Sequence, residues 1–88
     1  MIELSKDKII ERFRSYVALD TASDDKSETS PSTAKQLKLA KLLKSELSGL
    51  GLDDVALTEY GYVLAALPAN TNEKLPVIGL LAHMDTSN

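Results

Sequence analysis

The strongest constraint on the fold comes from residues 77–82, which are apolar at every position. A strand with one wet face alternates apolar and polar residues, whereas a strand covered on both faces is a nearly continuous apolar run. The run has an ordinary length for a strand and is far too short to cross a bilayer. It therefore predicts an interior strand, in a layered fold whose other elements cover both of its faces.

A first helix is predicted near the start of the chain, over residues 7–19. Ile9, Phe13 and Val17 recur there at helical spacing, with charged residues between them. Ser5 is positioned to accept a hydrogen bond from a free backbone N–H of the first turn. The pattern indicates an amphipathic helix that packs one face against the rest of the molecule.

A second helix is predicted to begin at Ser32 and Thr33, because Thr33 and Gln36 have the spacing of a capping box. A leucine-rich seam follows, and Gly49 and Gly51 end the helix. Its lysines form a regular stripe, which we interpret as a solvated face rather than a phosphate site because the chain is acidic overall. They are Lys35, Lys38, Lys41 and Lys44.

The remaining segments complete an α/β pattern. Residues 20–31 are polar and predict a loop, not a calcium-binding EF-hand, because no glycine is available for the sharp turn. Residues 55–59 and 62–67 read as two strands joined by a short turn containing Gly61, which predicts a hairpin. The expected order is two helices, a hairpin and the buried strand at residues 77–82.

Composition narrows the class of protein further. With 88 residues the chain is long enough for one small domain, and its net charge of −3 offers no broad basic field for nucleic acid or an anionic membrane. Because cysteine is absent, disulfides and thiolate metal sites are excluded, so a metal would need imidazole and carboxylate ligands. Residues 1–7 do not have the pattern of a signal peptide, which predicts a cytoplasmic protein.

The one histidine, His83, directly follows the predicted buried strand, and Asp85 lies two residues further on. Ligand sites in open α/β sheets gather beyond the carboxyl ends of strands, and alternation would project both side chains to the same side. Imidazole is a common zinc ligand, and a nearby carboxylate can orient it. Taken alone, the pair is a weak signal, and a surface histidine that ends a strand is the more common explanation. A serine hydrolase is disfavoured because no Gly-x-Ser-x-Gly elbow is present.

Several strings, in the right order, resemble the peptidase T branch of the zinc exopeptidases, which also include carboxypeptidase G and aminoacylase. They cover nearly the whole chain and include Glu11-Arg12-Phe13, Asp20-Thr21-x-Ser23-Asp24, Thr29-x-Pro31-Ser32-Thr33, Gly61-Tyr62-Val63 and His83-Met84-Asp85-Thr86-Ser87. One departure is Asn88, which stands where the family usually has proline.

The resemblance implies a tripeptide aminopeptidase that acts on short peptides with two zinc ions in its complete site. It implies that His83 is a zinc ligand and that Asp85 is the acidic catalytic-site residue that holds this histidine. Residues 1–88 would then be the N-terminal, incomplete part of a metallopeptidase catalytic domain. The family's other ligands and its general base lie in segments that this sequence does not contain, so we expect the chain alone to be inactive and to bind zinc weakly.

Two alternatives stay open. One is a sister hydrolase on the same zinc frame, such as a dipeptidase or a deacylase. The other is a catalytically silent interaction module in which His83 is incidental. In either case, an interior strand without its covering elements would recruit other chains, so we expect contact with the remainder of the domain or self-association.

Overall fold

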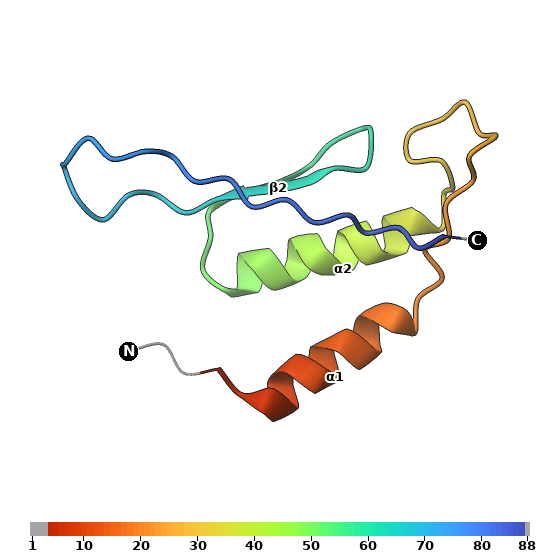
Figure 1. Cartoon of the computed structure of the whole chain (residues 1–88), viewed down its shortest axis with the longest axis horizontal. Helices are drawn as coiled ribbons and strands as arrows, with labels where there is room; N and C mark the ends of the chain where they lie inside the picture. The colour runs from red at the N-terminus through yellow and green to blue at the C-terminus, as the bar shows by residue number, and fades with distance from the viewer. Residues whose placement is uncertain (1–3, 88) are drawn as a thin grey trace.

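The structure is a computed structural model that describes residues 4–87. Its elements, in chain order, are α1 (Lys6–Val17), α2 (Gln36–Gly49), β1 (Asp54–Leu57) and β2 (Val63–Ala66). The predicted succession of two helices and a hairpin is confirmed, and the arrangement is α/β (Figure 1). Residues 1–3 and Asn88, the residue that departs from the family pattern, lie outside the described part of the chain.

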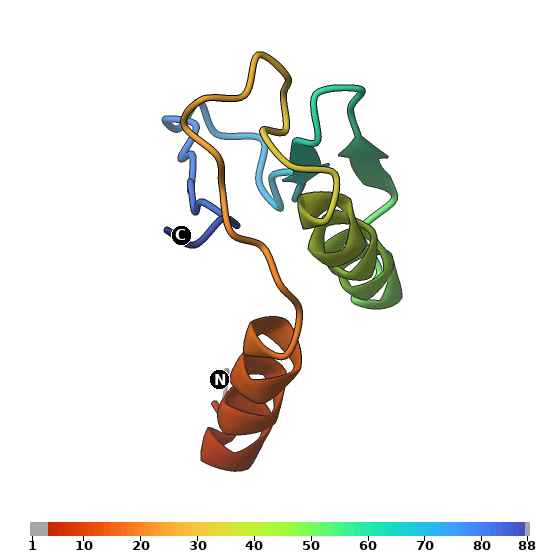
Figure 2. The same cartoon turned by 90° about the vertical axis from the view of Figure 1, so that its right-hand side faces the viewer.

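Helix α1 is capped as its sequence predicts. The Ser5 hydroxyl accepts a hydrogen bond from the Lys8 N–H at 3.4 Å, and Asp7 lies in the first turn, at the positive end of the helix dipole. However, no residue of α1 is buried, and Phe13 on its apolar side is 63% exposed. The helix stands apart from the α2–hairpin layer (Figure 2), so its predicted packing face is uncovered within residues 4–87.

Helix α2 begins later than the capping-box spacing predicts. Its N-cap is Lys35, which makes no side-chain capping bond, and Gln36 is the first helical residue. The Thr33 hydroxyl instead donates to the Ala22 carbonyl oxygen at 2.9 Å, so it ties the preceding loop rather than capping the helix. The predicted end is confirmed, because the helix stops at Gly49 and Gly51 has a positive φ of 93°.

Strands β1 and β2 form the predicted antiparallel hairpin, with Asp54 opposite Ala66 and Leu57 opposite Val63. The turn between them needs glycine at Gly61, whose φ is 84°. A Cβ at this position would lie 3.0 Å from Cδ of Pro31, so the turn also packs closely against the end of the long polar loop.

The hydrophobic core is small and lies on α2. Leu39 and Ala40 are the buried apolar residues of the described chain, at 5% and 0% exposure. The helix lies against the hairpin (Figure 2), so its apolar seam is covered mainly from one side. A core of this size implies a thin margin of stability.

The predicted buried strand at residues 77–82 is wrong for this chain. The segment forms no strand within the described residues, and Val77, Leu80 and Leu81 are 99%, 95% and 101% exposed. Figure 2 shows it standing away from the α2–hairpin layer. The prediction fails because residues 4–87 supply this apolar run with neither a backbone partner nor a covering face.

In the described part of the chain, no helix is both long enough and apolar enough to span a bilayer. The cytoplasmic location stays a prediction.

Candidate functional site

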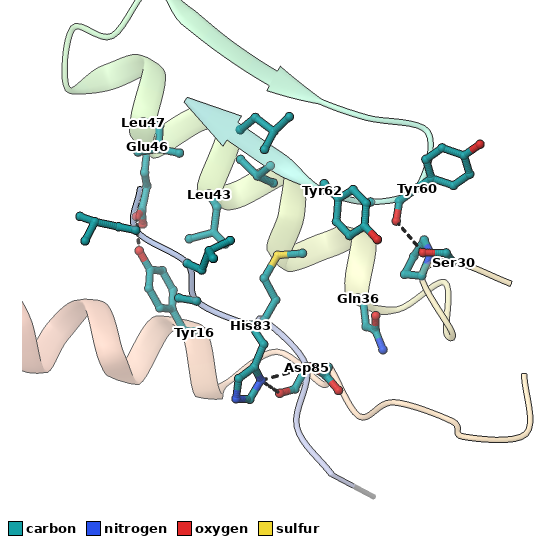
Figure 3. Close-up of a pocket in the computed structure, with 18 of the residues that line it drawn as sticks. Tyr16, Ser30, Gln36, Leu43, Glu46, Leu47, Tyr60, Tyr62, His83 and Asp85 are labelled. Carbon is teal, nitrogen blue, oxygen red and sulfur yellow. Dashed lines mark hydrogen bonds and ion pairs between the residues drawn. The ribbon is translucent and has the colours of Figure 1, made fainter. Parts of the chain in front are cut away.

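A groove of about 1020 Å³ runs between the α2–hairpin layer and the C-terminal segment (Figure 3). One wall carries apolar side chains of α2 and β2, including Leu43, Leu47 and Val63. The opposite wall is formed by residues 80–85, and Tyr16 of α1 lies at one end. The groove is therefore mainly apolar, with polar groups at its margins.

His83 lies on the wall formed by the C-terminal segment, with Asp85 beside it (Figure 3). The Nδ1 atom of His83 lies 3.2 Å from Oδ1 of Asp85 and 2.9 Å from the Asp85 backbone oxygen. Both neighbours are acceptors, so Nδ1 carries the proton and donates. That tautomer leaves a lone pair on Nε2, and the side chain is 85% exposed.

The structure thus brings together the two site residues predicted from the sequence. Their pairing does not depend on a strand, since this part of the chain is not in a sheet. Extended backbone through Met84 is sufficient to place side chains two residues apart on the same side. What the sequence did not reveal is how the pair is attached to the rest of the molecule.

The attachment comes from the long polar loop. Ala22 and Thr86 form an isolated parallel bridge, in which the Ser23 N–H donates to the Thr86 carbonyl at 2.9 Å. The Thr86 N–H donates to the Thr21 carbonyl at 3.2 Å, and Thr21 is only 3% exposed. The sequence pattern predicted only a polar, solvated loop here. The one sign of a further role is that the strings that carry the family resemblance include Thr21 and Ser23.

Hydrogen bonding favours the ionised form of Asp85. The Ser23 hydroxyl is the main cause that lowers the pKa of the Asp85 carboxyl, with a further contribution from His83. The carboxylate is therefore charged, and its Oδ1 accepts a hydrogen bond from His83. An ionised partner of this kind stabilises an imidazole that donates through Nδ1.

A second polar cluster closes the far end of the groove. The Tyr16 hydroxyl donates to the Glu46 carboxylate (Figure 3). Nε of Arg12 lies 3.5 Å from Oε2 of the same carboxylate. Burial and the hydrogen bond to Glu46 raise the pKa of Tyr16 to about 12. The helical spacing of the apolar residues in α1 did not predict this link between α1 and α2.

A metal site needs several ligating side chains placed around one point. Among residues 4–87, no group of three or more His, Cys, Asp or Glu side chains is arranged to hold an ion. His83 with Asp85 does fit one ligand and its orienting partner, because Nε2 faces outward while Nδ1 is held. The described residues therefore do not form a complete metal site.

An exposed imidazole held by a carboxylate at the wall of an apolar groove defines a class of site. Histidines that bind a cation or exchange a proton with a bound ligand have this arrangement.

Comparison with known proteins gives a more particular relationship, although no protein-family model matches the chain. It is 54% identical over 82 residues to Peptidase T of Geobacillus sp. strain WCH70 and 56% identical over 80 residues to Peptidase T of Halothermothrix orenii. It is 51% identical over 82 residues to Peptidase T of Bacillus subtilis strain 168.

These alignments cover 91% to 93% of this chain and 20% of each relative. The resemblance to peptidase T seen in the motifs is confirmed over most of the chain. The chain spans about one fifth of the length of the curated relatives that it matches.

Proposed function

We propose that this chain supplies a zinc ligand, and the residue that positions it, to a tripeptide aminopeptidase of the peptidase T kind. The observation that carries the proposal is the His83–Asp85 pair at the groove wall. It occurs in a chain that is 51% to 57% identical to curated proteins named Peptidase T. Two zinc ions per complete site are part of the proposal, with the remaining ligands supplied from outside this chain.

Each residue has a distinct role in this proposal. His83 binds the cation through Nε2, because its Nδ1 is already engaged by Asp85. Asp85 is a positioning residue, since it fixes the tautomer and the ring orientation and increases the basicity of the ligating nitrogen. Zinc held there supplies polarisation of the scissile carbonyl and a water molecule of lowered pKa.

The groove supports a small organic substrate. Its apolar wall on α2 and β2 suits the side chains of a short peptide, and its polar groups lie at the margins. A tripeptide bound along the groove would lie beside His83 at one margin, while Tyr16 and Glu46 close the far end. The apolar wall binds the substrate and excludes water, while the metal ligands carry the chemistry.

The chain by itself is proposed to be inactive and to bind zinc weakly. A catalytic zinc site has three protein ligands and an open position, whereas His83 is a single ligand. Calorimetric titration of the 88-residue chain with zinc is expected to give weak binding. A tight, stoichiometric site on the monomer would contradict this part of the proposal.

The function is tested in a chimera in which this chain replaces the matching segment of the Bacillus subtilis relative. We expect the chimera to cleave tripeptides and His83→Ala to lower kcat/KM by more than about a hundredfold, the upper limit for loss of a second-shell group. Lys41→Ala, at an exposed position of α2, serves as the control and is expected to leave activity unchanged.

The same assay separates the alternatives. Faster cleavage of dipeptides or N-acyl amino acids than of tripeptides would favour a sister hydrolase. A chimera that folds but hydrolyses none of these would favour the silent interaction module, which the exposed apolar residues at 77–81 would suit. A His83→Ala chimera as active as the parent would contradict the zinc-ligand role.

A further inference from the structure

We propose that Ser23 is a positioning residue that holds the His83–Asp85 pair in place, acting as a latch between the long polar loop and the C-terminal segment. The inference deepens the proposed function and depends on it for its catalytic consequence. Its structural part, the control of the His83 ring by Ser23, can be tested without any activity.

Ser23 holds the segment that carries the site through both its backbone and its side chain. Its backbone N–H donates to the Thr86 carbonyl at 2.9 Å, and its hydroxyl oxygen lies 3.2 Å from the same carbonyl. The same hydroxyl is the main influence that lowers the pKa of the neighbouring Asp85 carboxyl. One residue, 63 positions away in sequence from Thr86, therefore holds the backbone directly next to the group that orients His83.

This latch matters because little else holds the segment. Within residues 4–87, the hydrogen bonds that reach residues 77–87 from elsewhere in the chain come only from Thr21 and Ser23. The preceding run is almost fully exposed, with Leu81 at 101%. The direction in which His83 projects is thus set by two residues of the loop rather than by a sheet.

The loop is itself ordered well enough to act as an anchor. Ala22, which pairs with Thr86, receives the Thr33 hydroxyl on its carbonyl at 2.9 Å and gives its N–H to Asp20 at 3.1 Å. Thr33 lies three residues before the first residue of α2. The latch therefore connects the site to the start of the helix that carries the core.

The first test is nuclear magnetic resonance of the His83 ring nitrogens in the 88-residue chain near pH ~8, where imidazole is ordinarily neutral. The wild-type chain is expected to show the Nδ1–H tautomer. Ser23→Ala is expected to reduce the population of that tautomer about twofold or more, because Asp85 is no longer held. Ser23→Thr keeps a hydroxyl and should restore it.

Ser27→Ala is the matched control, because Ser27 lies in the same loop but bonds Thr29 rather than the site. An unchanged tautomer in Ser23→Ala, or an equal change in Ser27→Ala, would overturn the proposed role of Ser23.

Hydrogen exchange in the wild-type chain tests the same role without requiring that any variant folds. The Ser23 and Thr86 amides should exchange with solvent about tenfold more slowly than those of Leu80 and Leu81, and equal rates would also overturn it.

The catalytic consequence is read in the chimera. Ser23→Ala should weaken zinc binding about tenfold in a chelator competition and lower kcat more than it raises KM, with recovery in Ser23→Thr. Unaltered zinc affinity would overturn this consequence. A parent chimera without activity would count against the proposed function, whereas the ring-nitrogen and exchange measurements would still decide whether the latch exists.

Discussion

At the scale of single residues, Asp20 shows how one carboxylate organises the loop that reaches the site. One of its oxygens accepts the Ala22 N–H at 3.1 Å, and the other lies 3.1 Å from Nζ of Lys35. Both interactions favour the ionised form, so the pKa of Asp20 is lowered, with the backbone hydrogen bond as the larger cause. Ala22 in turn pairs with Thr86, so this charge supports the segment that carries His83.

Acidification should therefore loosen the loop in a defined direction. Because the folded-state pKa of Asp20 is depressed, its stabilising contribution is present above the ordinary value of 3.8 and is lost as the pH falls through the lowered pKa. The chemical shift of the Ala22 amide, followed during acid titration, should have its midpoint below 3.8. Lys35→Met should move that midpoint upward only in part, because the backbone bond remains.

Lys41→Met removes a lysine from an exposed position of α2 and is the control for the acid titration of the Ala22 amide. It should leave the midpoint where it is in the parent chain. A midpoint at or above 3.8 in the parent would show that the Ala22 and Lys35 interactions do not act on Asp20 as described.

At the scale of elements, a polar contact rather than an apolar one links α1 to α2. The apolar side of α1 is exposed, with Phe13 at 63% and Val17 at 60%, while Tyr16 reaches Glu46 on α2. Burial and this hydrogen bond hold Tyr16 in its neutral form and raise its pKa to about 12. In the described chain, the position of α1 thus depends on the contacts of Tyr16 and Arg12 with Glu46.

Tyr16→Phe should loosen the attachment of α1 to α2, while the Arg12–Glu46 ion pair remains. Loss of a hydrogen bond to a carboxylate that is partly exposed is expected to cost about 1 kcal/mol, measured by urea unfolding. A raised pKa contributes stability that is complete below 10 and disappears as the pH rises through about 12. The parent should therefore lose stability over that interval more steeply than Tyr16→Phe.

Ser15→Ala, one position away on α1, removes a hydroxyl that bonds only the Arg12 carbonyl of its own helix. We expect it to be nearly neutral. Equal stability of Tyr16→Phe and the parent chain would mean that the Glu46 contact does not hold α1.

At the scale of the whole molecule, a small buried core coexists with a long exposed apolar run. Among residues 4–87, the buried apolar residues are Leu39 and Ala40, whereas Val77, Leu80 and Leu81 are almost fully exposed. Exposed apolar surface with unpaired backbone recruits other chains. We propose that the remainder of the catalytic domain covers this run in the complete protein and that a second copy covers it in the isolated chain.

Sedimentation velocity tests this proposal. The average mass of the 88-residue chain should rise with concentration, and Leu81→Glu should shift the association to higher concentration by about tenfold or more, because it places a charge in the apolar contact. Asn72→Glu adds the same charge to an exposed turn and should have little effect. A parent chain that stays monomeric at high concentration would refute self-association.

Much of the fold and part of the site could be predicted from local patterns. Helical spacing, the Ser5 cap and the glycine at the hairpin turn all act between residues close in sequence, and the structure contains each of them. The pairing of His83 and Asp85 has the same origin, since two residues of extended chain suffice. The contacts of Thr33 and Tyr16 were missed because their partners, Ala22 and Glu46, lie 11 and 30 positions away.

The amino-acid sequence by itself determined the order of the elements, the apolar character of residues 77–82 and the identity of the two site residues, because these depend on local sterics and side-chain chemistry. Only the tertiary structure decided that the apolar run lies exposed and that Thr21 and Ser23 hold Thr86. The physical reason is that burial of an apolar run and long-range hydrogen bonds both need partners that the fold brings together in space. Spacing along the chain does not show which partners will meet.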